Sequence, residues 1–295
     1  MTQQSKTPRF TLGMCVHNDI DGVYFSCQGN RLLNPIIDSE GEIIIIDNQP
    51  DSPDGKQTKK FSDAASKVVR YIPYTEKQST SIRNLVFDHA RAPIVICIDS
   101  HVLLPTGGIQ AVLNYLEDPH NQNSPKLVQG PMYDDQLDKL YTHWNDLWNA
   151  GMQGRWELDN RAIDPNGKPY PIYAQGLGCF AARKEHWLRF NENFRGFGGE
   201  EVYIHNKYRK AGGECICIPA FRWVHRFYRA QKVKYIDGLD NRLFNYLVGA
   251  FELQQDTAPI LEYFRSALSE SRVFKIYNQA LRVATVNNMQ IEKNG

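Results

Sequence analysis

The sequence carries almost no net charge and has no long apolar run. Lys and Arg number 34 and Asp and Glu number 33 among 295 residues, so the formal net charge is +1. This balance provides no overall field for binding nucleic acid, a membrane surface or an acidic polymer. No apolar run approaches the roughly 20 residues of a membrane-spanning helix, and residues 1–9 lack the apolar segment of a signal peptide. We therefore expect a soluble, cytoplasmic protein with no membrane partner.

The cysteines lack the spacing of a metal-binding or redox motif. None of the six forms a CxxC pair, and four lie within apolar, strand-like runs, where a free thiol behaves as a small hydrophobic side chain. This pattern argues against a cysteine zinc site and a disulfide framework, and it favours a reducing compartment. The six are Cys15, Cys27, Cys97, Cys179, Cys215 and Cys217.

The first half of the chain alternates short apolar runs with helical patterns. Continuous apolar strands that alternate with helices predict a parallel sheet covered on both faces. Such sheets bind ligands at the carboxyl ends of their strands, where Asp47 and Asp99 stand. Residues 79–89 have helical spacing, with Thr80 or Ser81 as the N-cap. The predicted strands are residues 10–16, 42–47, 68–72 and 93–99.

An aromatic stripe follows in residues 134–149. Tyr141, Trp144 and Trp148 stand at helical spacing. We interpret the stripe as the core face of a helix in preference to a surface that stacks on sugar.

The second half of the chain becomes helical towards its end. Residues 49–60 and 155–170 are rich in polar and turn-forming residues and are predicted as exposed loops. A boundary near residue 236 separates a main domain, residues 1–236, from a helical C-terminal region, residues 237–295, packed on it. The remaining predicted helices are 107–117, 200–210, 241–253, 259–268 and 272–283, and the remaining predicted strands are 215–219 and 221–225.

The triplet Asp99-Ser100-His101 directly follows a predicted buried strand. A carboxylate and an imidazole separated by one residue can chelate a divalent cation, and mixed oxygen and nitrogen ligands suit Mn²⁺ better than Ca²⁺. Such an ion neutralises a leaving diphosphate as a Lewis acid. Taken alone the motif is weak, because a strand-end Asp often only caps a helix.

Four ordered segments give the triplet a context. ICIDSH ends at His101, GLGCF spans residues 176–180, FGGEE spans 197–201 and WVHRF spans 223–227. In order and approximate spacing they resemble motifs of polypeptide N-acetylgalactosaminyltransferases and the wider group of GT-A sugar transferases. Three positions depart from that pattern: Phe197 stands where the family has Trp, Glu201 where it has Asn, and Val224 where it has Gly. WVHRF and the segment 241–253 are also, more loosely, similar to bacteriophage glycosyltransferase-like proteins, some associated with sugar modification of hydroxymethylated DNA bases.

The resemblance implies a fold, a reaction and a metal centre. It implies a GT-A α/β fold, with a Rossmann-like mixed sheet that binds a nucleotide sugar and helices on both faces, plus the helical C-terminal region. The reaction is transfer of a hexose from a UDP-sugar to a hydroxyl acceptor, with Mn²⁺ or Mg²⁺ bound by Asp99, His101 and His225. For His225 the alternative is a strand-end histidine satisfied by hydrogen bonds.

The same resemblance places several residues around the nucleotide sugar. Asp47, with Asn48 beside it, binds the base or ribose, although capping of the next turn is an equal alternative. Arg83 contacts a phosphate or pairs with Asp99. Asn18 and Asp19 follow the first strand and line the same crevice. The other residues assigned to nucleotide-sugar binding are Ser100, Gly178, Phe197 and Gly199.

Two carboxylates, Glu200 and Glu201, open a predicted helix behind two glycines. Carboxylates are favourable there through the helix dipole alone. In inverting enzymes of this fold an acidic pair at this place supplies the general base, whereas in the retaining enzymes the corresponding Glu binds substrate. We take Glu201 as the first candidate for the base and Glu200 as the second, and the stereochemistry stays open.

Basic residues with aromatic residues between them cluster in the segment 222–234. Contact with the diphosphate, by Arg226 above all, is the first interpretation, and contact with DNA is the second. The acceptor remains open between a protein Ser or Thr, a glycan and a hydroxymethylated pyrimidine in phage DNA, as does the oligomeric state. A nucleotide-sugar or glycan-binding protein without turnover and a metal-dependent phosphoesterase are the rival functions. The cluster consists of Arg222, Arg226, Arg229, Lys232 and Lys234, interleaved with Trp223, Phe227, Tyr228 and Tyr235.

Overall fold

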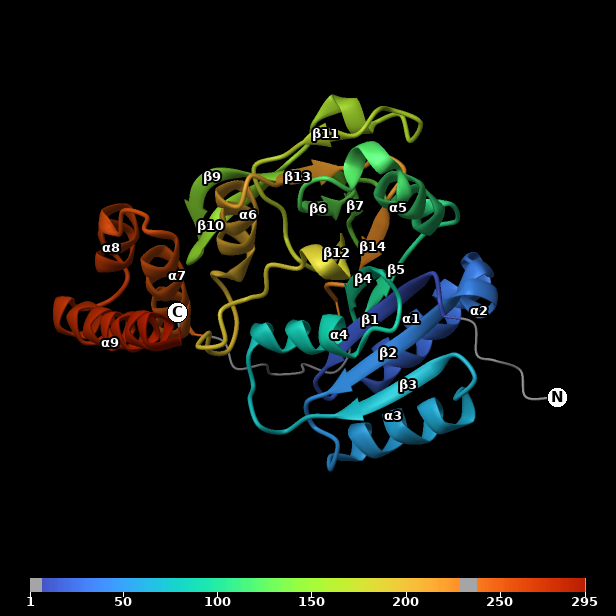
Figure 1. Cartoon of the computed structure of the whole chain (residues 1–295), viewed down its shortest axis with the longest axis horizontal. Helices are drawn as coiled ribbons and strands as arrows, with labels where there is room; N and C mark the ends of the chain where they lie inside the picture. The colour runs from blue at the N-terminus through green and yellow to red at the C-terminus, as the bar shows by residue number, and fades with distance from the viewer. Residues whose placement is uncertain (1–6, 229–237, 295) are drawn as a thin grey trace.

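A mixed sheet of eight strands runs through the middle of the molecule (Figure 1). The structure is a computed structural model, and it describes residues 7–228 and 238–294. Strands β4, β1, β2 and β3 run parallel, whereas β12 is antiparallel to its neighbours β4 and β6. The predicted parallel strands are therefore confirmed as one half of a mixed sheet. In order across the sheet the strands are β11 (Tyr170–Pro171), β13 (Glu214–Cys217), β6 (Lys126–Gln129), β12 (Cys179–Arg183), β4 (Ile94–Asp99), β1 (Phe10–Val16), β2 (Gly41–Asp47) and β3 (Val69–Pro73).

Helices cover both faces of this sheet because its strands are apolar on both sides. In β2, Ile43 and Ile45 belong to one buried cluster, and Ile44 and Ile46 belong to the other. The first cluster lies under α1 (Ile20–Leu33), α2 (Ile36–Glu40), α3 (Pro53–Ala64) and α5 (Gly108–Glu117). The second lies under α4 (Arg83–His89), α6 (Glu200–Lys210), α7 (Leu239–Leu253), α8 (Ala258–Arg265) and α9 (Glu270–Asn294).

Two smaller sheets lie beside the main one. A hairpin pairs β9 (His143–Asn149) with β10 (Met152–Glu157). In the other, β14 pairs with β5 so that His225 stands opposite Val102, which brings a late segment of the chain next to the end of β4. Its strands are β5 (Val102–Leu103), β14 (Trp223–His225), β7 (Met132–Tyr133) and β8 (Leu140–Tyr141). Short 3-10 turns are η1 (Thr80–Ile82), η2 (Pro119–Asn121), η3 (Asn160–Ala162) and η4 (Lys184–His186).

The predicted C-terminal helices are present, as α7, α8 and α9, and they pack beside α6 and the β9–β10 hairpin (Figure 1). Leu247 of α7, Phe264 of α8 and Ile276 of α9 are buried in the same apolar cluster as Phe180 of the main sheet. The proposed boundary near residue 236 falls outside the described residues. Among the described helices, none is long and apolar enough to cross a bilayer.

The predicted helix across residues 134–149 is wrong. The segment forms β8 and β9, and Trp144 and Trp148 lie on the hairpin. Spacings of three and four residues fit a helix, but a spacing of four is also two strand periods, so the pattern does not separate the two. In the hairpin a register shift lies between the two indoles, with Trp144 opposite Trp156 and Trp148 opposite Gln153, and they join different apolar clusters.

Two predicted loops and one predicted cap also need correction. Most of residues 49–60 belong to α3, whose N-cap Ser52 accepts the Gly55 N–H and whose first position is Pro53. The loop predicted for residues 155–170 begins inside β10. Ser79, in place of Thr80 or Ser81, caps the turn before α4.

Candidate active site

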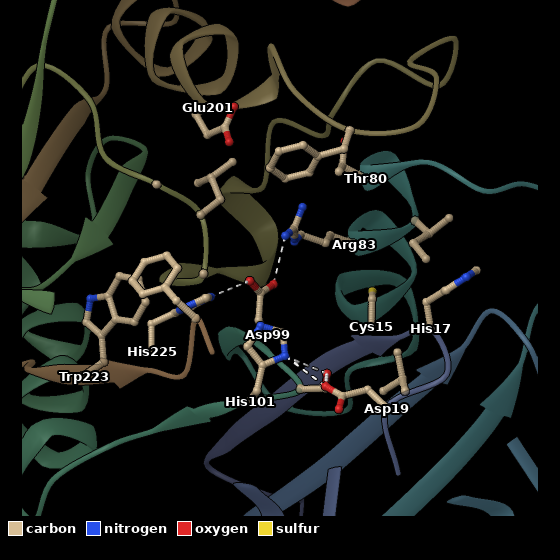
Figure 2. A pocket seen from close by; sticks show the side chains of 18 of the residues that line it. Cys15, His17, Asp19, Thr80, Arg83, Asp99, His101, Glu201, Trp223 and His225 are labelled. Atoms are coloured by element: carbon tan, nitrogen blue, oxygen red, sulfur yellow. Dashed lines mark hydrogen bonds and ion pairs between the residues drawn. The ribbon is translucent and has the colours of Figure 1, made fainter. Parts of the chain in front are cut away.

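A cavity of about 630 Å³ opens at the carboxyl ends of β1, β2 and β4 (Figure 2). This is the edge at which parallel strands place ligand-binding side chains. One wall comes from the residues after β1 and β4, and the opposite wall comes from β14 and the start of α6. In Figure 2 Asp99 lies in the middle, with His17 and Asp19 on one side and Trp223 and His225 on the other.

The three predicted metal ligands meet in this cavity. Asp99 Oδ2 lies 3.6 Å from His225 Nε2, and the rings of His101 and His225 are 4.8 Å apart and nearly perpendicular. The β5–β14 pairing accounts for this meeting, since the Arg226 N–H donates to the carbonyl of His101. One ligand-bearing strand is thus tied to the other by backbone hydrogen bonds.

Helix α1 holds the segment that carries His101. Ser26 donates to the Ser100 carbonyl, and Asn30 donates to the Val102 carbonyl, both within the buried interior. The carboxylate of Asp19, at the N-cap of α1, accepts from Ser100 Oγ at 2.6 Å and lies 2.9 Å from His101 Nδ1. A carboxylate on one ring nitrogen fixes the tautomer and leaves the other, Nε2, as the metal-binding atom.

Arg83 supplies the positive charge behind Asp99. Its guanidinium donates to Asp99 Oδ1 at 2.9 Å and lies 3.7 Å from Glu200 Oε1. Burial opposes ionisation of Asp99, but Arg83 and His225 outweigh it and hold the pKa of this carboxyl well below its usual range. Of the two predicted roles for Arg83, pairing with Asp99 is therefore the contact present.

The donor set fits a small divalent cation. Asp99, His101 and His225 each offer one ligand atom, and these atoms lie within 4.8 Å of one another. Ligands on opposite sides of an ion with bonds of about 2.1 Å are about 4.2 Å apart, so a side-chain movement of well under an ångström closes the set. One carboxylate oxygen and two imidazole nitrogens suit a transition ion such as Mn²⁺.

The two glutamates at the start of α6 have different surroundings. In the turn before them Gly198 has φ +99° and Gly199 has φ +92°. These backbone angles lie in the left-handed region, which favours glycine. Glu200 is fully buried and accepts the Gly198 N–H, facing Arg83. Glu201 lines the cavity, and in Figure 2 its carboxylate points towards Asp99 and Arg83. Burial, and then the neighbouring Glu200, raise the pKa of Glu201 well above its usual range.

Of the glycine and aromatic residues predicted to bind the nucleotide sugar, Phe197 and Gly178 lie in the cavity wall, while Gly199 does not line it. A Cβ on Gly178 would come 2.9 Å from the Trp223 ring and 3.1 Å from the His225 ring, so glycine lets these rings approach the backbone. The Gly178 carbonyl also accepts the Asp99 N–H.

The predicted nucleotide-side residues reach the cavity unequally. Asp47 is 1% exposed and accepts from the Gln49 N–H and the Tyr71 hydroxyl, which are the bonds of the turn-capping alternative. Asn48, its neighbour, does line the cavity. Asn18 adopts φ +50° and does not line it, although residues on either side do. Roles of Asp47 and Asn18 in nucleotide binding stay predictions.

Of the five basic residues predicted to cluster in the segment 222–234, the structure describes two, Arg222 and Arg226. Arg222 donates to the carbonyls of Ala162 and Ile163. The half-exposed guanidinium of Arg226 lies 3.9 Å from Asp19, the residue that contacts the candidate metal ligand His101. Outside the described residues are Arg229, Lys232 and Lys234, together with the aromatic Tyr235.

Sequence reasoning missed residues that shape the site from a distance. Asn245 of α7 is fully buried and makes three hydrogen bonds to the turn before α6: it accepts from the Arg195 N–H and donates to the carbonyls of Arg195 and Gly198. Trp156 of the hairpin lines the cavity, as does Trp144, for which a core role was preferred over stacking on sugar. No local signal marks an asparagine in a helix as a clamp for a turn that lies about 50 residues away.

Comparison with known proteins identifies relatives at the level of family and fold. A family model described as Glycosyl transferase family 2 matches residues 30–189, more than half of the chain. No curated protein matches the sequence.

Several solved structures share the fold at low sequence identity. GalNAc-T7, solved with UDP, GalNAc and Mn²⁺, superposes with a TM-score of 0.65 and 15% identity over 94% of this chain, which spans only 55% of that protein. Staphylococcus aureus TarS 1-349, in complex with UDP-GlcNAc, has a TM-score of 0.56 and 11% identity, covering 92% of this chain and 71% of that one. The mannosyltransferase PcManGT of Pyrobaculum calidifontis, solved with GDP-Man and Mn²⁺, has a TM-score of 0.54 and 15% identity. The match covers 96% of this chain and 76% of that one.

Proposed function

The chain belongs to glycosyl transferase family 2, and we propose that it transfers a sugar from a UDP-sugar to an acceptor hydroxyl with the help of a bound divalent cation. Its fold is the GT-A fold that the sequence predicted. The observation that carries the proposal is the meeting of Asp99, His101 and His225 in one cavity with Glu201 on its wall.

The chain's own residues have separate tasks in this proposal. Asp99, His101 and His225 hold the cation, Mn²⁺ or Mg²⁺, which supplies positive charge for the leaving diphosphate. Arg83 keeps Asp99 ionised and in place. Arg226, beside the metal centre and half-exposed, is positioned to contact the same phosphates.

Glu201 is the proposed general base. Its raised pKa makes it a stronger proton acceptor than an exposed carboxylate. The acceptor hydroxyl gives its proton to Glu201, its oxygen bonds to the anomeric carbon, and the bond from that carbon to the diphosphate breaks. This arrangement is that of an inverting enzyme, so the anomeric configuration of the product tests the role of Glu201.

A donor and acceptor panel tests the function directly. We expect release of UDP from at least one of UDP-glucose, UDP-galactose or UDP-N-acetylglucosamine in the presence of Mn²⁺, whereas turnover of GDP-mannose alone would contradict a UDP-sugar donor. Mass spectrometry then identifies the product among a saccharide, a Ser/Thr peptide and DNA containing hydroxymethylated pyrimidine. Asp99→Ala abolishes the release, whereas Asp63→Ala, at an exposed carboxylate of α3, leaves it unchanged. Absence of turnover with every donor would reject the proposal.

A further inference from the structure

One end of the cavity is built from aromatic side chains that the proposed donor chemistry leaves unused. Trp144 of β9 and Trp156 of β10 line the cavity beside Gly176, and Trp223 of β14 and Phe227 line it next to the His225 ring. Figure 2 shows Trp223 on the opposite side of Asp99 from His17 and Asp19. A diphosphate bound at Asp99 therefore divides the cavity into a nucleotide end and an aromatic end.

The aromatic wall is held in place by buried polar contacts. Trp144 and Trp156 contact each other edge to face, with ring centroids 5.7 Å apart. The backbone N–H of Trp144 donates to the Ala174 carbonyl, and the fully buried Gln175 side chain donates to the Thr142 carbonyl. The wall is therefore part of the rigid framework of the fold.

Gly176 is shaped to fit the two indoles. A Cβ at this position would come 2.8 Å from Trp156 Cζ2 and 3.5 Å from Trp144 Cζ2. The first distance is closer than real Cβ contacts, so only glycine lets the Trp156 ring lie where it does. Trp144 is almost fully buried and supports Trp156, which is half-buried, while Phe227 is 53% exposed at the rim.

Among the described residues, the charges at this end favour a neutral ring over a polyanion. Glu201 supplies a carboxylate, and the described lining residues at this end include no Lys or Arg. The nearby Arg83 is already paired with Asp99 and Glu200. Binding of a nucleic-acid strand depends on cations that neutralise phosphates, whereas the apolar face of a sugar ring packs on indole without charge.

We infer that the aromatic end is the acceptor subsite and that it binds the pyranose ring of a saccharide, stacked on Trp156 with a hydroxyl directed to Glu201. This inference rests on the proposed function and names its acceptor class. Trp156 provides the stacking face, Phe227 closes the rim, and Trp144 and Gly176 hold Trp156 in position.

Transfer to saccharides in aromatic variants tests the subsite. The probes are methyl β-D-glucopyranoside and methyl β-D-galactopyranoside, with a Ser/Thr peptide and an oligonucleotide containing hydroxymethylcytosine as competing acceptors. We expect transfer to a glycoside by the wild type, and a KM for it that rises about tenfold in Trp156→Ala and recovers in Trp156→Phe. Phe227→Ala, at an exposed position, produces a smaller rise, and the matched control Phe25→Ala, an exposed aromatic on α1, produces none.

Donor hydrolysis without acceptor separates the two levels of the account. The far-UV circular dichroism spectrum and the thermal unfolding transition of Trp156→Ala establish that this variant is folded. If the wild type hydrolyses the donor but the KM for the glycoside is unchanged in both Trp156→Ala and Phe227→Ala, the proposed subsite is rejected and the proposed function is not. Product on the oligonucleotide or the peptide but on neither glycoside overturns the subsite as well. Failure of the wild type to hydrolyse any donor overturns the proposed function, and the subsite with it.

Discussion

At the scale of single residues, Glu201 combines a cost in stability with a role in catalysis. Its pKa in the folded protein is raised, whereas in the unfolded chain it lies near its ordinary value of about 4.3. A raised carboxyl pKa means that the folded state is favoured by protonation below the unfolded pKa, and that this contribution is lost as the pH rises. At neutral pH the buried Glu201 therefore destabilises the fold.

Glu201→Gln should accordingly raise the free energy of unfolding at pH 7.5, and the gain should disappear below about pH 4.3. The same substitution should lower sugar transfer by about 10²-fold or more, because Gln accepts no proton. Urea unfolding at both pH values and a transfer assay measure the two effects. Glu192→Gln is the control, since the pKa of Glu192 is lowered and its loss should bring no gain. Equal stability of Glu201→Gln and the wild type at pH 7.5 would contradict the burial argument.

Asp19 is the second residue with a measurable task, because it orients His101. Asp19→Asn weakens the acceptor on His101 Nδ1 and should lower the affinity for Mn²⁺ about 10- to 100-fold. Asp21→Asn, at an exposed position in the first turn of the same helix, should leave it unchanged. Titration of Mn²⁺ by calorimetry or electron paramagnetic resonance measures both. An unchanged affinity in Asp19→Asn would show that His101 is oriented without it.

The candidate metal ligands could be predicted from the sequence, whereas the residues that support them could not. Asp99 and His101 are separated by one residue at the end of an apolar strand, and the motif around His225 stands in the order of the GT-A motifs. The bond between Asp19 and His101 joins residues 82 positions apart and leaves no local pattern. Asp47 shows the converse, since its strand-end position was predicted correctly but its carboxylate is engaged by Gln49 and Tyr71.

At the scale of elements, α7 positions the turn that carries the proposed base. Asn245→Ala removes the three hydrogen bonds that this fully buried side chain makes to the backbone of Arg195 and Gly198. We expect the free energy of unfolding to fall by about 1–3 kcal/mol and the kcat for transfer to fall with it, while binding of UDP and Mn²⁺ stays near that of the wild type. The control is Asn206→Ala, whose hydrogen bonds lie at the exposed surface. A loss of stability without loss of kcat would limit α7 to a structural role.

The β9–β10 hairpin shows why element type was predictable in some places and not in others. The continuous apolar runs of β1, β2 and β4 predict strands and not helices, because they are short and end in polar residues. In β9 the Trp144–Trp148 spacing fits helix and strand equally, and the hairpin is decided by distant contacts. Trp148 stacks on Tyr263 of α8 at 4.5 Å, and the Tyr246 hydroxyl of α7 accepts the Gln153 N–H.

At the scale of the whole molecule, the C-terminal helices and the sheet share one core. Leu247, Phe264 and Ile276 lie in the same buried cluster as Phe180. We propose that residues 1–236 are the catalytic domain and that the helical region 237–295 is an integral part of its core. Calorimetric unfolding should then show one cooperative transition. Two separate transitions, one insensitive to UDP with Mn²⁺, would contradict this integration.

We propose that Asp99, His101 and His225 form a metal centre that binds the diphosphate of the sugar donor. Isothermal titration of UDP tests it most directly, with Mn²⁺ or with EDTA, in the wild type, in His225→Ala and in the control His120→Ala, whose imidazole is exposed on η2. We predict that the wild type and His120→Ala bind UDP with Mn²⁺, and that EDTA or His225→Ala weakens binding at least tenfold. UDP affinity that is the same in EDTA, or unchanged in His225→Ala, would contradict the account.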